Sequence, residues 1–279
     1  SDLGGGGGGG RRRPESPQRV IYFPGDVQNY RELMARHAEN ARWQQWSLED
    51  TAALLLRRFP SSHVWIVKAS RMHLHKFSCY DNFVESDLFG APKHSPDYGA
   101  LGHLRALLSN ASKQSRSLLC PGRTDRRVST APAQPGANTS AQTPNGIAAP
   151  SGTDTGRARE KGGDAPLRTI LIGFSKGCVV LNQLLHELSE AQKDEELAAF
   201  IQTISQVYWL DGGHAGGSNT WVTSPEVLQE LARTGIPVQT HVTPYQVRDS
   251  MRAWIGKEHE KFVRLLRELG ANVTDQLHL

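Results

Sequence analysis

Short apolar runs alternate with segments of helical periodicity along most of the 279-residue chain. Runs rich in β-branched and other apolar residues predict strands at 19–23, 63–69, 167–173, 204–210, 236–243 and 271–277. Helices are expected from about residue 30, from a capping box at Ser47 to Pro60, and at 98–109, 176–188, 225–233 and 258–269. Because apolar strands that alternate with helices are typical of a buried parallel sheet, the pattern predicts one α/β domain.

Two segments fall outside this pattern. Residues 1–18 contain seven consecutive glycines and almost nothing apolar, and residues 111–166 are rich in Ser, Thr, Pro, Gly and Ala without one aromatic side chain. Neither segment offers enough apolar surface to offset the entropy of ordering a chain. We therefore expect a disordered N-terminal segment over 1–18, and a domain over 19–279 that a disordered insertion at 111–166 interrupts.

The charge of the chain lies mainly in these two segments. The net charge of the chain is +4. The insertion carries eight basic and four acidic side chains, and residues 1–18 carry three basic and two acidic ones. The remainder of the chain is therefore at −1, which argues against a basic groove for nucleic acid. No apolar run approaches the roughly 20 residues that a membrane-spanning helix needs.

The cysteines and most histidines show no recognisable metal pattern. Cys79, Cys120 and Cys178 have neither metal nor redox spacing, which favours a reducing compartment over a disulfide framework. His73 and His75 precede Cys79 in a polar connection that matches no common zinc motif. His259 lies between two glutamates and is expected on a solvated helix face. We expect no metal and no cofactor.

A candidate nucleophile lies between a predicted strand and a predicted helix. In LRTILIGFSKGCVVLNQLL (167–185), the residues Gly173 to Gly177 fit the pattern G-x-S-x-G. A nucleophile elbow needs a strand before the serine, a helix after it and small residues two positions away, because the serine backbone is strained. All of these are present, and a helix start favours a developing anion. Ser175 is therefore the candidate nucleophile.

Candidates for the acid and the base follow at later strand ends. Asp211 comes directly after the strand at 204–210, and His278 comes directly after the last strand. The chain order Ser, Asp, His is the order of a hydrolase triad, so we expect Asp211 to orient His278 and His278 to deprotonate Ser175. Asp249 is an alternative acid, and His214 is an alternative base that is more typical of a nearby loop residue.

The oxyanion hole is expected between two loops. The backbone N–H of Lys176 would act with that of Asp26, in the loop that follows the first strand. The carboxylate of Asp26 raises an objection, because at about 5 Å it would destabilise the oxyanion by roughly 3 kcal/mol at an effective dielectric constant of about 20. Asp26 must therefore point away, or Lys176 must compensate, or the site does not hydrolyse a substrate.

Four longer motifs carry a family resemblance. FPGDVQNY (23–30), LIGFSKGCVVLNQLL (171–185), WLDGGHAGGSNTWVT (209–223) and HVTPYQVRD (241–249) together resemble the animal family named chromosome 2 open reading frame 69. The resemblance implies a three-layer α/β-hydrolase-like fold with a mostly parallel sheet. It also implies a location in the mitochondrial matrix and a role in respiratory function and mitochondrial gene expression.

The resemblance also has two departures. The usual hydrolase fold begins with two strands before the one at 19–23, and residues 1–18 cannot supply them. The family chain continues beyond the segment that matches the end of this sequence and includes another histidine, which is a further alternative to His278.

Two functions are compatible with these residues. The first is a serine hydrolase that acts on a small ester, thioester or amide of unknown identity. The alternative is a scaffold or binding protein that keeps the fold without turnover and acts through a protein partner. A histidine nitrogen within about 3.5 Å of the Ser175 hydroxyl would favour the enzyme.

Overall fold

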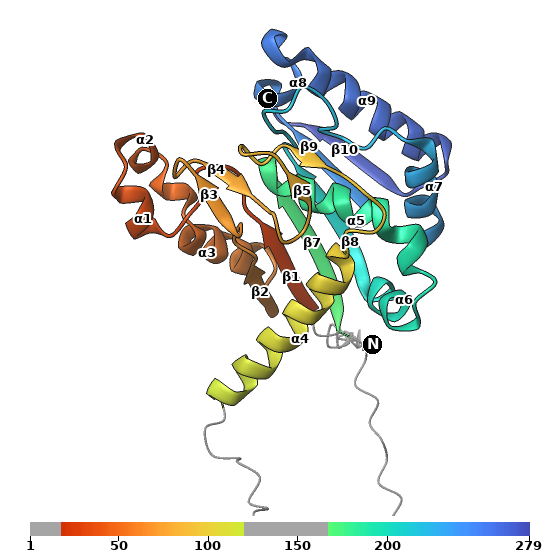
Figure 1. Cartoon of the computed structure of the whole chain (residues 1–279), viewed down its shortest axis with the longest axis horizontal. Helices are drawn as coiled ribbons and strands as arrows, with labels where there is room; N and C mark the ends of the chain where they lie inside the picture. The colour runs from red at the N-terminus through yellow and green to blue at the C-terminus, as the bar shows by residue number, and fades with distance from the viewer. Residues whose placement is uncertain (1–17, 120–166) are drawn as a thin grey trace, which may run out of the picture. The chain divides into compact units, whose positions relative to one another are not determined.

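The computed structural model of the protein describes residues 18–119 and 167–279, and its centre is a six-stranded sheet (Figure 1). All pairings within this sheet are parallel, in the order β10-β9-β8-β7-β1-β2. The strands are β1 (Gln18–Phe23), β2 (Ser62–Ile66), β7 (Arg168–Phe174), β8 (Ile204–Leu210), β9 (Val238–Val242) and β10 (Val273–Leu277). The predicted α/β class and parallel sheet are confirmed.

Helices cover the two faces of the sheet unequally. On one face, Leu55 of α3 (Leu48–Arg58) packs against Val20 and Tyr22 of β1 and against β7. The opposite face packs against α4 (Ala100–Leu119), α5 (Cys178–Ala191), α7 (Pro225–Thr234) and α9 (Ala253–Glu268). The larger apolar core therefore lies on the side of α5, where fully buried side chains such as Trp209 and Phe262 meet.

Short elements connect these layers. Between β1 and α3 lie α1 (Arg31–Ala35), α2 (Ala38–Ala41) and the 3₁₀ turn η1 (Gln44–Trp46). After β2 come two small antiparallel ribbons, β3 (Arg71–His73) with β4 (Phe77–Cys79) and β5 (Glu85–Ser86) with β6 (Pro92–Lys93). The remaining elements are η2 (Ser175–Gly177), α6 (Glu195–Gln202), α8 (Pro244–Val247) and η3 (Ser250–Arg252).

Several predicted boundaries were wrong. α4 continues to Leu119, nine residues into the insertion expected at 111–166, because residues 111–119 contain no helix breaker and the first proline follows at Pro121. Gln18, placed in the disordered N-terminal segment, pairs with Ser62 and Arg168 in the sheet. The expected disorder at 1–17 and 120–166 lies outside the described residues.

The register brings several strand ends to one edge of the sheet. Phe23 at the end of β1 is opposite Gly173, and Phe174 at the end of β7 is opposite Leu210. Since the strands are parallel, the residues that follow β1, β7, β8, β9 and β10 emerge at the same edge. The candidate nucleophile, acid, base and oxyanion loop all lie directly after these strands.

Candidate functional site

Ser175 has the backbone conformation of a nucleophile elbow. It directly follows β7 and starts η2, and its φ angle is +50°, in the left-handed region that L-residues seldom occupy. α5 begins three residues later. The chain therefore turns sharply from strand to helix at Ser175, as the G-x-S-x-G pattern predicts.

Both glycines of the pattern are required by close packing. A Cβ atom on Gly177 would lie 2.0 Å from the carbonyl oxygen of Phe23, and one on Gly173 would lie 2.9 Å from Leu181 Cδ1 and 3.0 Å from Cys178 Cα. No side chain fits at Gly177, because the obstacle there is backbone. The elbow is therefore held tightly against the end of β1.

The loop after β1 lies directly against the serine. A Cβ atom on Gly25 would be 3.0 Å from Ser175 Cβ. Gln28 fixes the loop, because its Oε1 accepts hydrogen bonds from the Gly25 N–H at 2.8 Å and from the Tyr22 hydroxyl at 3.0 Å. In the described part of the chain, the Asp26 N–H has no hydrogen-bond acceptor. The loop therefore lies against Ser175, and the use of its Asp26 N–H in an oxyanion hole stays a prediction.

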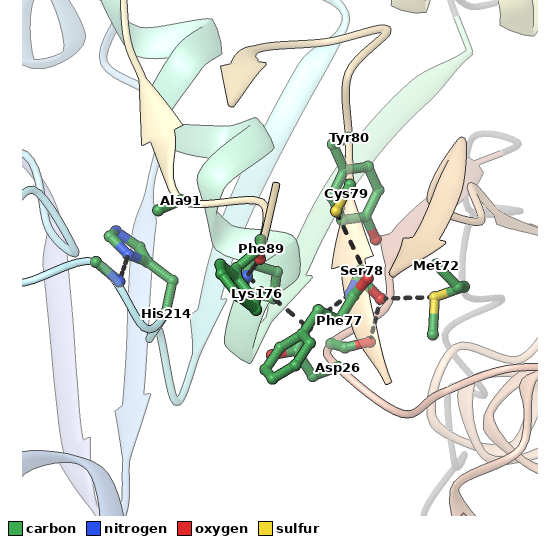
Figure 2. A network of polar contacts seen from close by, with 12 residues as sticks. Asp26, Met72, Phe77, Ser78, Cys79, Tyr80, Phe89, Ala91, Lys176 and His214 are labelled. Carbon is green, nitrogen blue, oxygen red and sulfur yellow. Dashed lines mark hydrogen bonds and ion pairs between the residues drawn. The ribbon is translucent and has the colours of Figure 1, made fainter. Parts of the chain in front are cut away.

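The carboxylate of Asp26 is held by two partners. Its Oδ1 accepts a hydrogen bond from the Ser78 N–H at 2.7 Å and lies 3.9 Å from Lys176 Nζ (Figure 2). Burial raises the pKa of Asp26, and the charge of Lys176 and the bond from Ser78 partly offset that rise. The Asp26 carboxylate, which the sequence analysis expected near the oxyanion, is therefore paired with the Lys176 ammonium and with the Ser78 N–H.

Lys176 is fully buried beside the nucleophile. Its side chain has 0% exposure, and Nζ donates to the Phe89 carbonyl oxygen at 2.6 Å, in the connection between β5 and β6. Figure 2 shows this side chain reaching from the elbow towards both Phe89 and Asp26. One ammonium group thus connects the elbow, the loop after β1 and the segment of small ribbons.

Asp211 is anchored to the strand beside it. It follows β8 with a φ angle of +50°, and its N–H donates to the His241 carbonyl oxygen at 2.7 Å. The carboxylate accepts two hydrogen bonds from Thr243, from N–H at 2.7 Å and from Oγ1 at 2.6 Å. Burial raises the pKa of Asp211, and the Thr243 bonds and the charges of His278 and Arg252 oppose this effect.

The charge of His278 opposes the rise that burial causes in the pKa of Asp211, but the His278 side chain contacts another histidine. The backbone N–H of His278 donates to the Val242 carbonyl oxygen at 2.8 Å, and this bond continues the pairing of β10 with β9. Its ring stacks on His241, with Nε2 2.9 Å from His241 Nδ1. Among the described residues, no histidine forms a hydrogen bond to Ser175. Ser175 and Asp211 follow the adjacent strands β7 and β8, whereas His278 follows β10, which β9 separates from β8, so the three candidates form no hydrogen-bonded relay.

The alternative acid and base have other partners. His214 is buried, its Nε2 is 3.1 Å from the Asn219 carbonyl oxygen, and its Nδ1 accepts from the Gly216 N–H at 3.1 Å. Asp249 accepts from Arg252 Nε at 2.7 Å and caps η3. Both ring nitrogens of His214 are used within its own loop, as expected of a loop residue near the site.

The described part of the chain contains neither a cluster of metal ligands nor a membrane-spanning helix. Within residues 18–119 and 167–279, no group of three or more His, Cys, Asp or Glu side chains is arranged to hold a metal ion. No helix in the same ranges is long and apolar enough to cross a membrane. Cys79 and Cys178 are free and buried.

The sequence did not predict the two residues that hold the loop after β1 and Asp211 in place, Gln28 and Thr243. Gln28 and Thr243 are polar residues without a motif, and their roles depend on partners 3 and 32 positions away. Gln28 is part of the FPGDVQNY segment and Thr243 of the HVTPYQVRD segment, but those segments did not reveal which atoms they would hold.

Comparison with known proteins gives a consistent family match. The C2orf69 family model matches residues 10–272. The chain is 55% identical over 270 residues to "Mitochondrial protein C2orf69 homolog" of Mus musculus, covering 95% of this chain and 74% of the relative. It is 53% identical over 287 residues to "Mitochondrial protein C2orf69" of Homo sapiens, covering 99% and 74%. The Danio rerio homolog is 48% identical over 259 residues, covering 93% and 67%. No solved structure matches the chain.

Proposed function

The chain belongs to the C2orf69 family, and we propose that it is a mitochondrial serine hydrolase with an α/β-hydrolase-like fold. The names of the mouse and human relatives support the mitochondrial location, and the proposed compartment is the matrix. The observation that carries the activity is the positive φ angle of Ser175 between two glycines that packing requires. Such strain persists only where the surrounding structure imposes it, and it is typical of functional sites.

In the proposed reaction, Ser175 Oγ attacks the carbonyl carbon of an ester, thioester or amide. His278 takes the serine proton and then gives it to the leaving group, and Asp211 orients the imidazole and stabilises its cation. The N–H groups of Asp26 and Lys176 hold the oxyanion. Water then cleaves the acyl-serine ester by the same steps. Because β9 and β8 lie between β10 and β7, the His278 ring must leave His241 and move across both of these strand ends to act as the base for Ser175.

A fluorophosphonate probe tests this proposal, because it reacts covalently only with an activated serine. We expect the folded protein to be labelled, Ser175→Ala to lose labelling, and Ser218→Ala, at an exposed serine of the loop after β8, to keep it. Heat-denatured protein is the background control. Equal labelling of Ser175→Ala and the wild type would contradict the assignment of Ser175.

A non-catalytic role is the second candidate, and the pairing of His278 with His241 favours it. In this role, the fold would serve as a scaffold or binding protein that supports mitochondrial gene expression or metabolism. Strain at the elbow would then be a relic or a packing feature of the family.

Complementation separates the two candidates. Cells that lack the family member would receive either the wild type or Ser175→Ala, and oxygen consumption would be measured. The hydrolase predicts that only the wild type restores respiration, whereas equal restoration by an unlabelled Ser175→Ala protein supports the scaffold. Restoration by neither protein would contradict the proposed respiratory role.

A further inference from the structure

A cavity lies on the α5 side of the sheet, and Ser175 is not among the residues that line it. Its volume is about 420 Å³. Its walls come from β6 and the following His94, from His186 on α5, and from the segment 219–224 before α7. A cavity of this size suits a small metabolite. Nothing in the proposed hydrolase reaction uses these residues.

The cavity walls hold buried polar atoms that lack partners. Both ring nitrogens of His94 are buried without a hydrogen bond in the described part of the chain. Trp221, which is 1% exposed and lines the same cavity, also has an indole N–H without a partner. Buried polar groups are nearly always hydrogen-bonded, and exceptions call for a specific explanation. Three such atoms lie on two residues of one cavity wall, just behind its surface, so a ligand in the cavity becomes their partner when the His94 and Trp221 rings turn towards it.

The charges of the lining indicate the chemistry of that ligand. Lys93, His94, His186, Asn219, Trp221, Thr223 and Ser224 are the polar lining residues, and none is a carboxylate. The ammonium of Lys93 is largely exposed, and its contact with Glu85 is long, at 3.4 Å. An ammonium and an indole N–H donate and never accept, so the lining favours a group with several acceptor oxygens.

The protonation state of His94 indicates which acceptor group the ligand carries. Burial, followed by the charges of His186 and His214, lowers the pKa of His94 to about 3, so its ring is neutral near pH 7. A neutral imidazole has one donor and one acceptor nitrogen. A hydrogen phosphate or a phosphate monoester can satisfy both nitrogens, since near pH 7 it presents acceptor oxygens and, in its singly charged form, also an O–H donor.

We propose that the cavity between His94, His186 and Trp221 binds the phosphate group of a small soluble metabolite. Lys93 at the rim supplies the countercharge, and the buried rings supply the directional hydrogen bonds. The site is independent of Ser175 and can exist in a hydrolase or in a scaffold.

Thermal unfolding with added anions tests this site on the full chain. Inorganic phosphate and glycerol phosphate should raise the unfolding temperature saturably, with Kd in the millimolar range or below, relative to chloride at equal ionic strength. Vesicles that contain phosphatidic acid form a third arm. Binding to these vesicles without binding of either soluble phosphate would overturn the assignment to a soluble metabolite.

Three variants test the residues. His94→Phe removes both orphaned nitrogens while keeping a planar ring, so it should unfold at a higher temperature without phosphate and lose the phosphate response. Lys93→Ala, at an exposed position, should fold normally and bind phosphate at least fivefold more weakly. His63→Gln, an exposed histidine on β2, should respond like the wild type.

Two results would overturn the proposal. One is the absence of a saturable response of the wild type to either soluble phosphate. The other is an equal response of the wild type and Lys93→Ala, a comparison that holds even if His94→Phe fails to fold.

Discussion

The two halves of the candidate site are built differently. The nucleophile half consists of Ser175, its flanking glycines and the loop after β1, and backbone contacts between elements adjacent in the sheet fix it. The acid–base half consists of Asp211 and His278. There Thr243, which follows β9, holds the acid, while the base follows β10 and contacts His241.

This difference teaches where the hydrolase proposal is strong. A group that packing holds from several sides is preorganised, whereas a side chain at a strand end can change partners at small cost. The strained turn of the nucleophile half is fixed by its packing, whereas the base half must still move for the proposed reaction. The predictions below test each half, from the largest expected effect to the smallest.

The largest effect is expected at Gly177. In Gly177→Ala the new methyl group would collide with the Phe23 carbonyl oxygen, 2.0 Å away, and neither backbone can retreat without disrupting β1 or the elbow. We expect the free energy of unfolding to fall by more than about 4 kcal/mol. Denaturant titration followed by circular dichroism measures it.

Gly102→Ala is the matched control for Gly177. Gly102 lies within α4, and a Cβ atom there meets nothing within 4 Å. This variant should be neutral or more stable by up to about 1 kcal/mol, because alanine is the better helix former. Similar stabilities of Gly102→Ala and Gly177→Ala would mean that the elbow is not tightly packed against β1.

The next effect is expected at the buried ammonium. Lys176→Met keeps much of the side-chain volume but leaves the Asp26 carboxylate without its cation and the Phe89 carbonyl oxygen without a donor. Removing one partner of a buried pair costs several kcal/mol, and the partial exposure of Asp26 reduces this to about 3 kcal/mol. Fluorophosphonate labelling should slow in parallel, since the loop after β1 loses its anchor.

A double variant isolates the charge effect. Asp26→Asn can still accept the hydrogen bond from the Ser78 N–H, and it removes the charge that Lys176→Met leaves unpaired. We expect the double variant to be more stable than Lys176→Met alone. If instead the two losses simply add, Asp26 and Lys176 do not interact, and Lys176 stabilises the site through its packing and its hydrogen bond to the Phe89 carbonyl oxygen.

A smaller, pH-dependent effect is expected at His214, in the loop that follows Asp211. Burial lowers the pKa of His214 from 6.5 to about 4. The unfolded state therefore binds a proton first as the pH falls, and stability that is complete above pH 6.5 is lost on the way down to pH 4. At pH 5 this effect has lowered the free energy of unfolding by about 2 kcal/mol.

Urea titrations at pH 7 and pH 5 measure this contribution. His214→Gln should lose less stability between the two pH values than the wild type, by about 2 kcal/mol. His63→Gln, at an exposed position, should behave like the wild type. An unchanged pH dependence in His214→Gln would show that the ring is not held in its neutral form.

The α/β class and the sharp turn at Ser175 were predictable because their signals are local. An apolar strand, a small residue on each side of Ser175 and an apolar helix face lie within about 20 residues, and each has one dominant physical meaning. The position of the Asp26 carboxylate was not predictable, because its donor Ser78 is 52 positions away and belongs to a ribbon without a strong pattern.

His259 illustrates the same limit. Its glutamate neighbours predicted a solvated face, but the side chain is 6% exposed and its Nε2 lies 3.0 Å from Asp275 Oδ1. The prediction was wrong because α9 begins at Ala253, five residues earlier than expected, and His259 follows the fully buried Ile255 by one helical turn. Local charge suggested exposure, whereas the helical register of a longer element determined burial.

The smallest effect is expected at the anchor of the acid. Thr243→Val removes the hydroxyl that donates to Asp211 Oδ2 at 2.6 Å and leaves the N–H bond to Oδ1 intact. The lost hydrogen bond should lower the free energy of unfolding by about 1 kcal/mol and raise the pKa of Asp211 further. Thr243→Ser, which keeps the hydroxyl, is the matched control.

The effect of Thr243→Val on labelling tests whether Asp211 orients the base. If Asp211 orients the base, Thr243→Val should slow fluorophosphonate labelling near pH 6 more than near pH 8, because a larger fraction of Asp211 is then protonated at the lower pH. If labelling is present but its pH dependence matches that of Thr243→Ser, then Asp211 serves only to join β8 to β9. The acid would then have to be sought elsewhere, with Asp249 as the first alternative.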